Sequence, residues 1–180
     1  MTVRALLRMG DPLLRQLAQP VMDCQAPHLV ELVADLQDTM EANSGAGLAA
    51  PQIGIPLRVV IFGGGGPNLR YPDAPPVPFT VLINPELTPL GEERTLGWEG
   101  CLSVPGLRGE VKRWNRLRYC GWTPEGSWLD RTVDGFHARV VQHECDHLDG
   151  VLFPDRLDTP QAFGFIAELE QSGRIPMVPS

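Results

Sequence analysis

Two histidines stand four residues apart in the segment QHECDHLDG, residues 142–150. On an α-helix, His143 and His147 would project from one face about one turn apart, where two imidazoles can bind the same metal ion. Glu144 would lie beside them as a base able to take a proton from water. The residue types and their spacing therefore predict a catalytic metal site.

The residues before the histidines favour a metal site over a chance match to this short pattern. Phe136, Val140 and His143 follow one another at intervals of four and three residues, so the histidines stand at the end of an apolar stripe. Imidazoles on a buried face need a polar partner, because burying them without one costs free energy. A shared metal ion would be such a partner.

A catalytic metal usually has three protein ligands, and the sequence offers two candidates for the third. Glu168 follows His147 by 21 residues (168 − 147), about where a thermolysin-like protease supplies a glutamate from a second helix. Cys101 lies in WEGCLSVPG, residues 98–106, where glycine and proline favour a tight backbone corner that can present a thiolate. Taken alone, Cys101 could also be a buried thiol without a metal, so these residues leave the third ligand open.

Composition restricts the possible functions of the chain. Its 180 residues, 43% hydrophobic and 21% charged, suit one globular domain with a sizeable core. The net charge of −7 argues against binding to DNA or to an anionic membrane, since both need a basic surface. No apolar run is long enough to span a bilayer, and the first 20 residues do not resemble a signal peptide. The four cysteines are scattered, so we expect reduced thiols in the cytoplasm.

Helices are predicted for four segments that would position these residues. The clearest is an amphipathic helix over residues 27–42, where apolar residues recur at intervals of three and four. These residues are Leu29, Leu32, Val33, Leu36 and Met40. Residues 136–148 form the helix that carries the histidines. We also expect a short helical segment within 11–20 and a last short helix over 160–171.

Strands are predicted for residues 57–62 and 79–84, which are rich in β-branched residues. The Gly- and Pro-rich segment 63–78 between them predicts a long, mobile surface loop. Residues 117–122 and 127–133 look like the two strands of a hairpin. Irregular strands with a few helices indicate an α+β fold rather than an alternating parallel sheet.

Three motifs in this order resemble those of the peptide deformylase family. They are GAGLAAPQ at 45–52, EGCLS at 99–103 and QHECDH at 142–147. Further similar segments extend the resemblance from about residue 5 to 157: DPLLR, LINPEL and GVLFPDRL. The resemblance implies one domain over residues 1–180, with antiparallel sheets packed around the central histidine helix and an N-terminal helix. In this fold, 63–78 would be a loop insertion and 159–180 a short C-terminal helix and tail.

The resemblance also implies a role for each site residue. The metal ligands would be Cys101, His143 and His147, which removes Glu168 from the site. Glu144 would be the catalytic acid and base: it takes a proton from water activated by the metal and returns it to the leaving amine. The negative charge on the attacked carbonyl would be stabilised by the side-chain amide of Gln52 and the backbone N–H of Leu102.

The implied reaction removes the N-formyl group from the formylmethionine of a newly made polypeptide and releases formate. Phe136 and Val140, on the same helix face as His143, are our candidates for the wall of a methionine slot, and Arg139 could cover it with its stem. Two further predictions concern the peptide backbone and the cleft edge. They place Ala46 and Gly47 as backbone partners of the extended peptide, and Arg108 at the edge of the cleft.

Two imidazoles and a thiolate suit Fe(II), Zn, Ni or Co, and the family resemblance implies one Fe(II) ion per chain, which the other metals can replace. A transient ribosome contact would fit this role, although the tail after Asp158 is short and not basic. Two other functions stay open: a thermolysin-like endopeptidase that uses Glu168, and a non-catalytic paralogue that binds formylated peptides. An intact Glu144 argues against the paralogue, because a binding protein needs no base.

Overall fold

The computed structural model describes residues 2–64 and 74–177. The helices in this part of the chain are α1 (Pro27–Ala42), α2 (Gly135–Leu148) and α3 (Ile166–Gln171). Short 3-10 helices are η1 (Pro12–Arg15), η2 (Ala50–Ile53), η3 (Phe153–Arg156) and η4 (Pro160–Ala162). The strands are β1 (Gly47–Ala49), β2 (Val59–Phe62), β3 (Thr80–Pro89), β4 (Arg94–Cys101), β5 (Val104–Trp114), β6 (Arg116–Trp122), β7 (Trp128–Asp134) and β8 (Phe163–Phe165).

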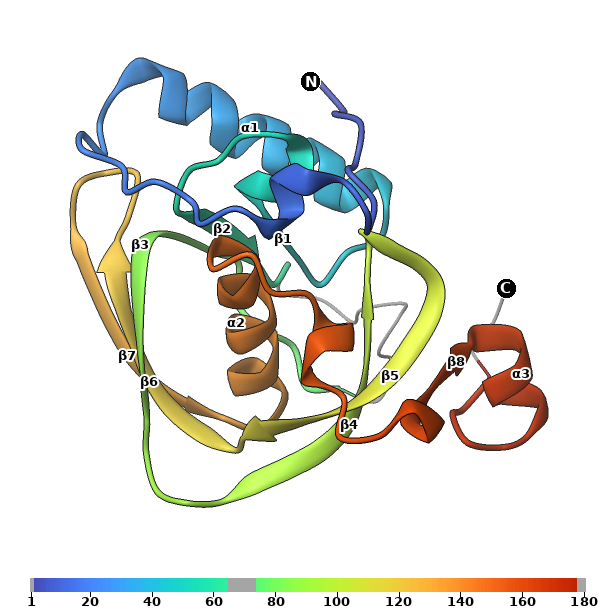
Figure 1. Cartoon of the computed structure of the whole chain (residues 1–180). Helices are drawn as coiled ribbons and strands as arrows, with labels where there is room; N and C mark the ends of the chain where they lie inside the picture. The colour runs from blue at the N-terminus through green and yellow to red at the C-terminus, as the bar shows by residue number, and fades with distance from the viewer. Residues whose placement is uncertain (1, 65–73, 178–180) are drawn as a thin grey trace.

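The strands form two antiparallel sheets. One has five strands in the order β1-β2-β3-β6-β7, and the other has three in the order β4-β5-β8. Figure 1 shows α2 between the two sheets, while α1 packs beside β1 and β2. The predicted α+β fold, with antiparallel sheets around the helix that carries the histidines, is confirmed.

Helix α1 follows the predicted apolar stripe. Pro27 opens the helix at a position where its missing N–H and fixed φ are favourable. The stripe residues Leu29, Leu32, Leu36 and Met40 are buried in one core cluster with residues of β1, β2 and β3. The helix therefore covers the edge of the five-stranded sheet formed by β1, which is part of the GAGLAAPQ segment.

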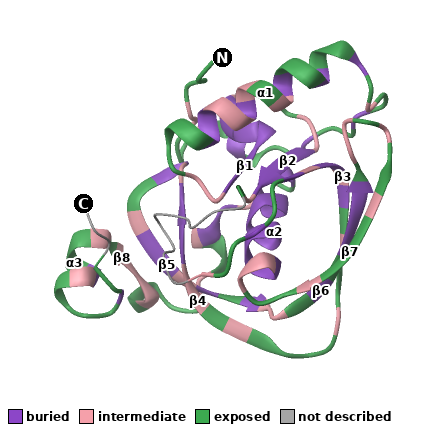
Figure 2. Cartoon of the chain, turned by 180° about the vertical axis from the view of Figure 1, so that it is seen from behind, coloured by how far each residue is buried: buried purple, intermediate pink, exposed green. Residues whose placement is uncertain are grey.

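Helix α2 lies in the interior of the molecule. All its residues from Ala138 to Leu148 are buried, which Figure 2 shows as an almost continuous purple helix. The helix ends at Leu148, and Gly150 then takes a positive φ of 72°. A side chain at Gly150 would place its Cβ 2.7 Å from the carbonyl oxygen of Arg15. The close approach of the N-terminal segment thus fixes where the histidine helix stops.

The prediction of secondary structure was incomplete or wrong in three places. Strands β4 and β5 were not predicted, because four glycines (Gly97, Gly100, Gly106 and Gly109) and many charged residues interrupt the alternation of apolar side chains. The expected helix over 160–171 is wrong in its first half. There a 3-10 turn, η4, is followed by Phe163–Phe165, which pair with β5 as strand β8, so the α-helix is limited to α3. The predicted strand 79–84 continues to Pro89.

The predicted mobile loop falls mostly on residues 65–73, which lie outside the described residues. Its flanking positions, 63–64 and 74–78, belong to no helix or strand. In the described ranges, no helix has the length and apolar character needed to cross a membrane.

Candidate active site

Helix α2 and strand β4 bring three metal-binding side chains together. Cys101 ends β4, where the hairpin to β5 turns through Leu102 and Ser103, and it faces the two histidines of α2. The Cys101 thiol and one ring nitrogen each of His143 and His147 all lie within 4.8 Å of one another. The Cys101 Sγ is 3.3 Å from Nε2 of His147, and all three residues are buried. Of the two candidates for a third ligand, the structure therefore brings Cys101 to the histidines.

Glu99 orients His143 from behind. Nδ1 of His143 donates to Oε2 of Glu99 at 2.9 Å, which leaves Nε2 for a metal. Arg113 holds the same carboxylate with two hydrogen bonds of 2.9 Å. Burial alone would raise the pKa of Glu99, but the hydrogen bonds from His143 and Arg113 hold it far below its ordinary value. Glu99 is therefore an anion that fixes one tautomer of the histidine.

Electrostatics favour the thiolate form of Cys101. Burial would raise the pKa of the thiol, but the imidazoles of His147 and His143 lower it well below its ordinary value. Burial would lower the pKa of His143, but the thiolate of Cys101 and the carboxylate of Glu99 raise it. A metal ion bound by the thiolate and the two imidazoles would replace the proton that these groups otherwise hold. A thiolate and two imidazoles whose ligand atoms lie within 4.8 Å of one another fit a divalent ion of the Fe(II) or Zn type.

Gln52 points its amide nitrogen at the same place. Its Oε1 accepts from the backbone N–H of Ala49 at 2.9 Å, and this bond assigns the opposite end of the amide as nitrogen. Its Nε2 lies 3.1 Å from Oγ of Ser103 and 3.4 Å from Sγ of Cys101. Gln52 is 1% exposed, so this donor is fixed beside the thiolate before any ligand arrives.

Glu144 packs against Gly47 of β1. A Cβ atom at position 47 would lie 2.5 Å from Oε1 of Glu144 and 2.7 Å from its Cδ. The strand can therefore approach the carboxylate only because residue 47 is a glycine. This contact holds Glu144, which is 5% exposed, on the side of α2 that faces the GAGLAAPQ segment.

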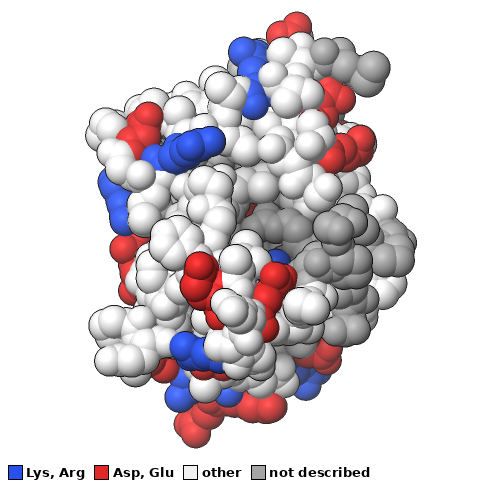
Figure 3. Space-filling view, turned by 90° about the vertical axis from the view of Figure 1, so that its right-hand side faces the viewer, with Lys and Arg blue, Asp and Glu red and all other residues white. Residues whose placement is uncertain are grey.

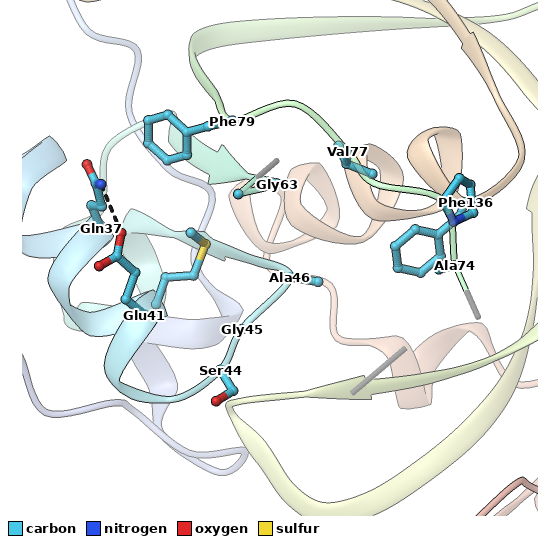
Figure 4. A pocket seen from close by; sticks show the side chains of 13 residues that line it. Gln37, Glu41, Ser44, Gly45, Ala46, Gly63, Ala74, Val77, Phe79 and Phe136 are labelled. Carbon is cyan, nitrogen blue, oxygen red and sulfur yellow. Dashed lines mark hydrogen bonds between the residues drawn. The ribbon is translucent and has the colours of Figure 1, made fainter. Parts of the chain in front are cut away.

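A small inner cavity adjoins these residues. It has a volume of about 30 Å³, room for about two water-sized spheres. It is lined by the following residues: Ala46, Gly47, Gln52, Glu99, Gly100, Cys101, Leu102, Phe136, Arg139, Val140, His143 and Glu144. A larger outer cavity of about 560 Å³ shares Ala46 and Phe136 with it and extends toward the end of α1 (Figure 4). The two cavities therefore meet at Phe136.

Ten of the twelve site residues predicted from the sequence line the inner cavity, and an eleventh, His147, belongs to the metal-binding group. Arg108 does not line either cavity; it lies on β5, in register with Gly164 of β8. Glu168 lies on α3 and is not part of the metal-binding group found among the described residues. Because Cys101 and not Glu168 completes the group, the endopeptidase alternative loses its support.

Residues around the metal-binding group make further contacts, some of which the sequence did not suggest. Asp146 pairs with Arg113 at 2.6 Å, and Cys145 packs in the core away from the metal-binding group. Arg139 was expected to contribute its stem to the slot, but its guanidinium is also buried among backbone carbonyls. Ser103, which accepts from Gln52, was not singled out, although it belongs to the EGCLS motif.

Comparisons with known proteins identify the family. The model of the polypeptide deformylase family matches residues 3–163. The chain is 58% identical to peptide deformylase 1 of Prochlorococcus marinus over 180 residues, which covers all of this chain and 94% of that protein. It is also 58% identical to peptide deformylase 2 of Ralstonia nicotianae over 163 residues, covering 91% of this chain and 92% of the relative.

Solved structures agree with the sequence relatives. The Met-Ala-Ser-bound crystal structure of a class I type b peptide deformylase from Acinetobacter baumannii matches with a TM-score of 0.82 at 40% identity. The match covers 87% of this chain and 99% of that one. The peptide deformylase of Thermotoga maritima matches with a TM-score of 0.76 at 33% identity, covering 88% of this chain and all of the other. The chain therefore belongs to the polypeptide deformylase family, the hydrolases that remove the N-formyl group from newly made polypeptides.

Proposed function

We propose that Cys101, His143 and His147 hold one divalent ion, that this ion is Fe(II) in the cell, and that Zn, Ni or Co can replace it. The observation that carries the proposal is the convergence of three buried donors within 4.8 Å, with His143 already oriented by Glu99. The mixed set of one thiolate and two imidazoles suits these ions better than Mg or Ca, which prefer oxygen ligands.

The surrounding residues have distinct roles in the hydrolysis. When bound, the ion would supply Lewis-acid chemistry, lowering the pKa of a water molecule and polarising the formyl oxygen. Glu144 takes the proton of the attacking water and later gives it to the nitrogen of the leaving amine. The amide of Gln52 and the backbone N–H of Leu102 donate to the oxygen as its negative charge develops. Because Gln52 is already fixed by Ala49, this donor needs little reorganisation.

The substrate that we propose is the N-formylmethionyl end of a nascent polypeptide. Phe136, Val140 and the stem of Arg139 form the apolar wall for the methionine side chain. The inner cavity of about 30 Å³ is too small for that side chain, so we expect the wall to open where Phe136 separates it from the outer cavity. The backbone of Ala46 and Gly47 would bind the extended peptide. The Met-Ala-Ser ligand of the Acinetobacter relative has the chemistry of such a product.

The same substrate implies a cytoplasmic enzyme that meets nascent chains close to the ribosome. Figure 3 faces the side of the molecule that carries α3 and shows basic and acidic side chains in small separate groups, not one basic patch. We therefore propose that any ribosome contact is transient and does not depend on the C-terminal tail.

Formate release from formyl-Met-Ala-Ser tests this proposal, using protein prepared without oxygen and loaded with Fe(II) or with Zn. We expect turnover with both ions, no hydrolysis of acetyl-Met-Ala-Ser, and no cleavage of internal peptide bonds. An active Fe(II) enzyme that cuts internal bonds would contradict the proposed substrate. Protein with one bound ion and no formate release would contradict the proposed roles of the site.

A further inference from the structure

Arg139 has a buried guanidinium whose hydrogen bonds reach both the second sheet and the metal site. Its Nη1 donates to the carbonyl of Val111 at 2.8 Å and to that of Gly97 at 3.3 Å, and its Nη2 donates to the carbonyl of Thr95 at 2.8 Å. The same Nη1 lies 2.8 Å from Oε1 of Glu99. Only 11% of the side chain is exposed, so one buried guanidinium makes hydrogen bonds from α2 to both β4 and β5.

Gly97 of β4 leaves the space that the guanidinium of Arg139 occupies. A Cβ atom at position 97 would lie 2.8 Å from Cζ, 2.9 Å from Nη2 and 3.0 Å from Nε of Arg139. A long side chain can usually move away from such a contact at little cost. Arg139 cannot do so freely, because four acceptors hold its head. The glycine at 97 and the arginine at 139 therefore form a complementary pair.

Glu99 connects this pair to a metal ligand. One carboxylate oxygen, Oε1, accepts from Arg139, and the other, Oε2, accepts from Nδ1 of His143. The carboxylate is 2% exposed and has no solvent to compensate for a lost partner. Arg113 also donates to both carboxylate oxygens, so if the guanidinium of Arg139 moves, Oε1 keeps one of its two donors. The carboxylate then settles between Arg113 and His143 alone, and the orientation of the His143 imidazole changes with it.

We propose that Arg139 is a positioning residue for His143, acting through Glu99, while its stem is part of the methionine slot. The inference rests on the proposed role of His143 as a metal ligand. The methionine slot and the metal-binding group then depend on one side chain, Arg139. A mutation can remove its charged head and keep an apolar stem. The methylene stem of Arg139 lines the inner cavity, whereas its charged head orients the imidazole of His143 through Glu99.

Arg139→Met separates these two parts, because methionine keeps an apolar stem and removes the head. We expect kcat for formyl-Met-Ala-Ser to fall about tenfold while KM changes less than about twofold. The independent readout is the absorption spectrum of the Co(II)-loaded protein, whose d–d bands report the ligand geometry at the ion. Gly97→Ala should shift these bands in the same direction, because it displaces the guanidinium that Arg139→Met removes.

A double mutant tests whether both changes act through one group. In the Arg139→Met background, Gly97→Ala should cost less than about twofold in kcat and leave the Co(II) bands unchanged, because no guanidinium remains to be displaced. Gly164→Ala is the matched control, because its new Cβ would be 3.4 Å from Leu169, an ordinary contact.

The results separate the failure of this inference from failure of the proposed metal site. If the wild type bound no Co(II), the proposed role of His143 would fall, and the inference with it. If the wild type bound Co(II) normally and Arg139→Met kept the same bands and kcat, the metal site would stand and the positioning role would be overturned. Equal effects of Gly97→Ala in both backgrounds would also overturn it. If Arg139→Met does not fold, Gly97→Ala alone still tests the positioning role. Co(II) bands of Gly97→Ala at the wild-type position would contradict the proposal.

Discussion

Replacement of Gly47 by alanine is the sharpest test of how the fold holds the catalytic carboxylate. The new Cβ would lie 2.5 Å from Oε1 of Glu144, where real contacts of this kind essentially never fall below 3.0 Å. Either the carboxylate or strand β1 must move by at least about 0.5 Å (3.0 − 2.5) to relieve the overlap. Position 47 is paired with Phe62 in the sheet, so we expect the side chain of Glu144 to move.

The size of the effect follows from the displacement. A misplacement of about 1 Å in a catalytic group can cost about 100-fold in rate, so a shift of half that size should cost about tenfold or more. The loss should appear in kcat, because the proposed role of Glu144 is to take the proton of the water and not to bind the peptide. Metal content should stay at the wild-type level, since Gly47 lies against the carboxylate and not against the three metal-binding side chains.

Formate release from formyl-Met-Ala-Ser, measured over a range of concentrations, gives kcat and KM for Gly47→Ala. Metal analysis of the same samples and Gly164→Ala as a control exclude a general effect of adding a methyl group. A Gly47→Ala enzyme with wild-type kcat would refute the reasoning. So would a loss of activity explained entirely by lost metal.

Three further predictions concern other parts of the site and fold. Gln52→Ala should lower kcat by about 10²- to 10³-fold with unchanged metal content, in assays of formate release and bound metal. Phe136→Ala should raise KM for formyl-Met-Ala-Ser several-fold, because it removes a wall of the slot; an unchanged KM would exclude Phe136 from it. Burial opposes the shift, but hydrogen bonds from Arg15 and the Leu152 amide lower the pKa of Asp155, so its carboxylate stabilises the fold above the unfolded-state pKa. Asp155→Asn should therefore lower the free energy of unfolding at pH 7 by about 0.5 to 1 kcal/mol, a modest value because solvent screens this partly exposed group. In urea unfolding, the difference should shrink as the pH falls through the lower folded-state pKa, and a difference that grew in acid would contradict this assignment.

The sequence predicted best those elements whose pattern is local. Helix α1 begins and ends at the expected residues, and α2 differs by one residue at its start, because both carry apolar side chains at helical spacing. Strands β4 and β5 could not be found in this way. Their glycines include Gly97 and Gly109, and each makes room for a side chain from another element: Arg139 at one and Phe153 at the other. The reason for these glycines lies in tertiary contacts that spacing along the chain does not reveal.

In the site, too, local spacing predicted some features and tertiary packing determined the others. Spacing on one helix was enough to suggest His143 and His147, while Cys101 remained one of two candidates until the resemblance to a family favoured it. The bonds of Glu99 join residues 40 and 44 positions apart in the chain, to Arg139 and His143. Only the packing of α2 against the hairpin of β4 and β5 places these charges together, so no local pattern could predict their contacts.

The most direct test of the account combines metal content and turnover in the same samples of Glu144→Gln and Cys101→Ser. If Glu144 is the base and not a ligand, Glu144→Gln should bind one ion per chain and lose formate release by at least about 100-fold. If Cys101 supplies the thiolate, Cys101→Ser should lose both the ion and the activity. A Glu144→Gln enzyme that releases formate at the wild-type rate, or a Cys101→Ser protein that retains its ion and turnover, would contradict the account.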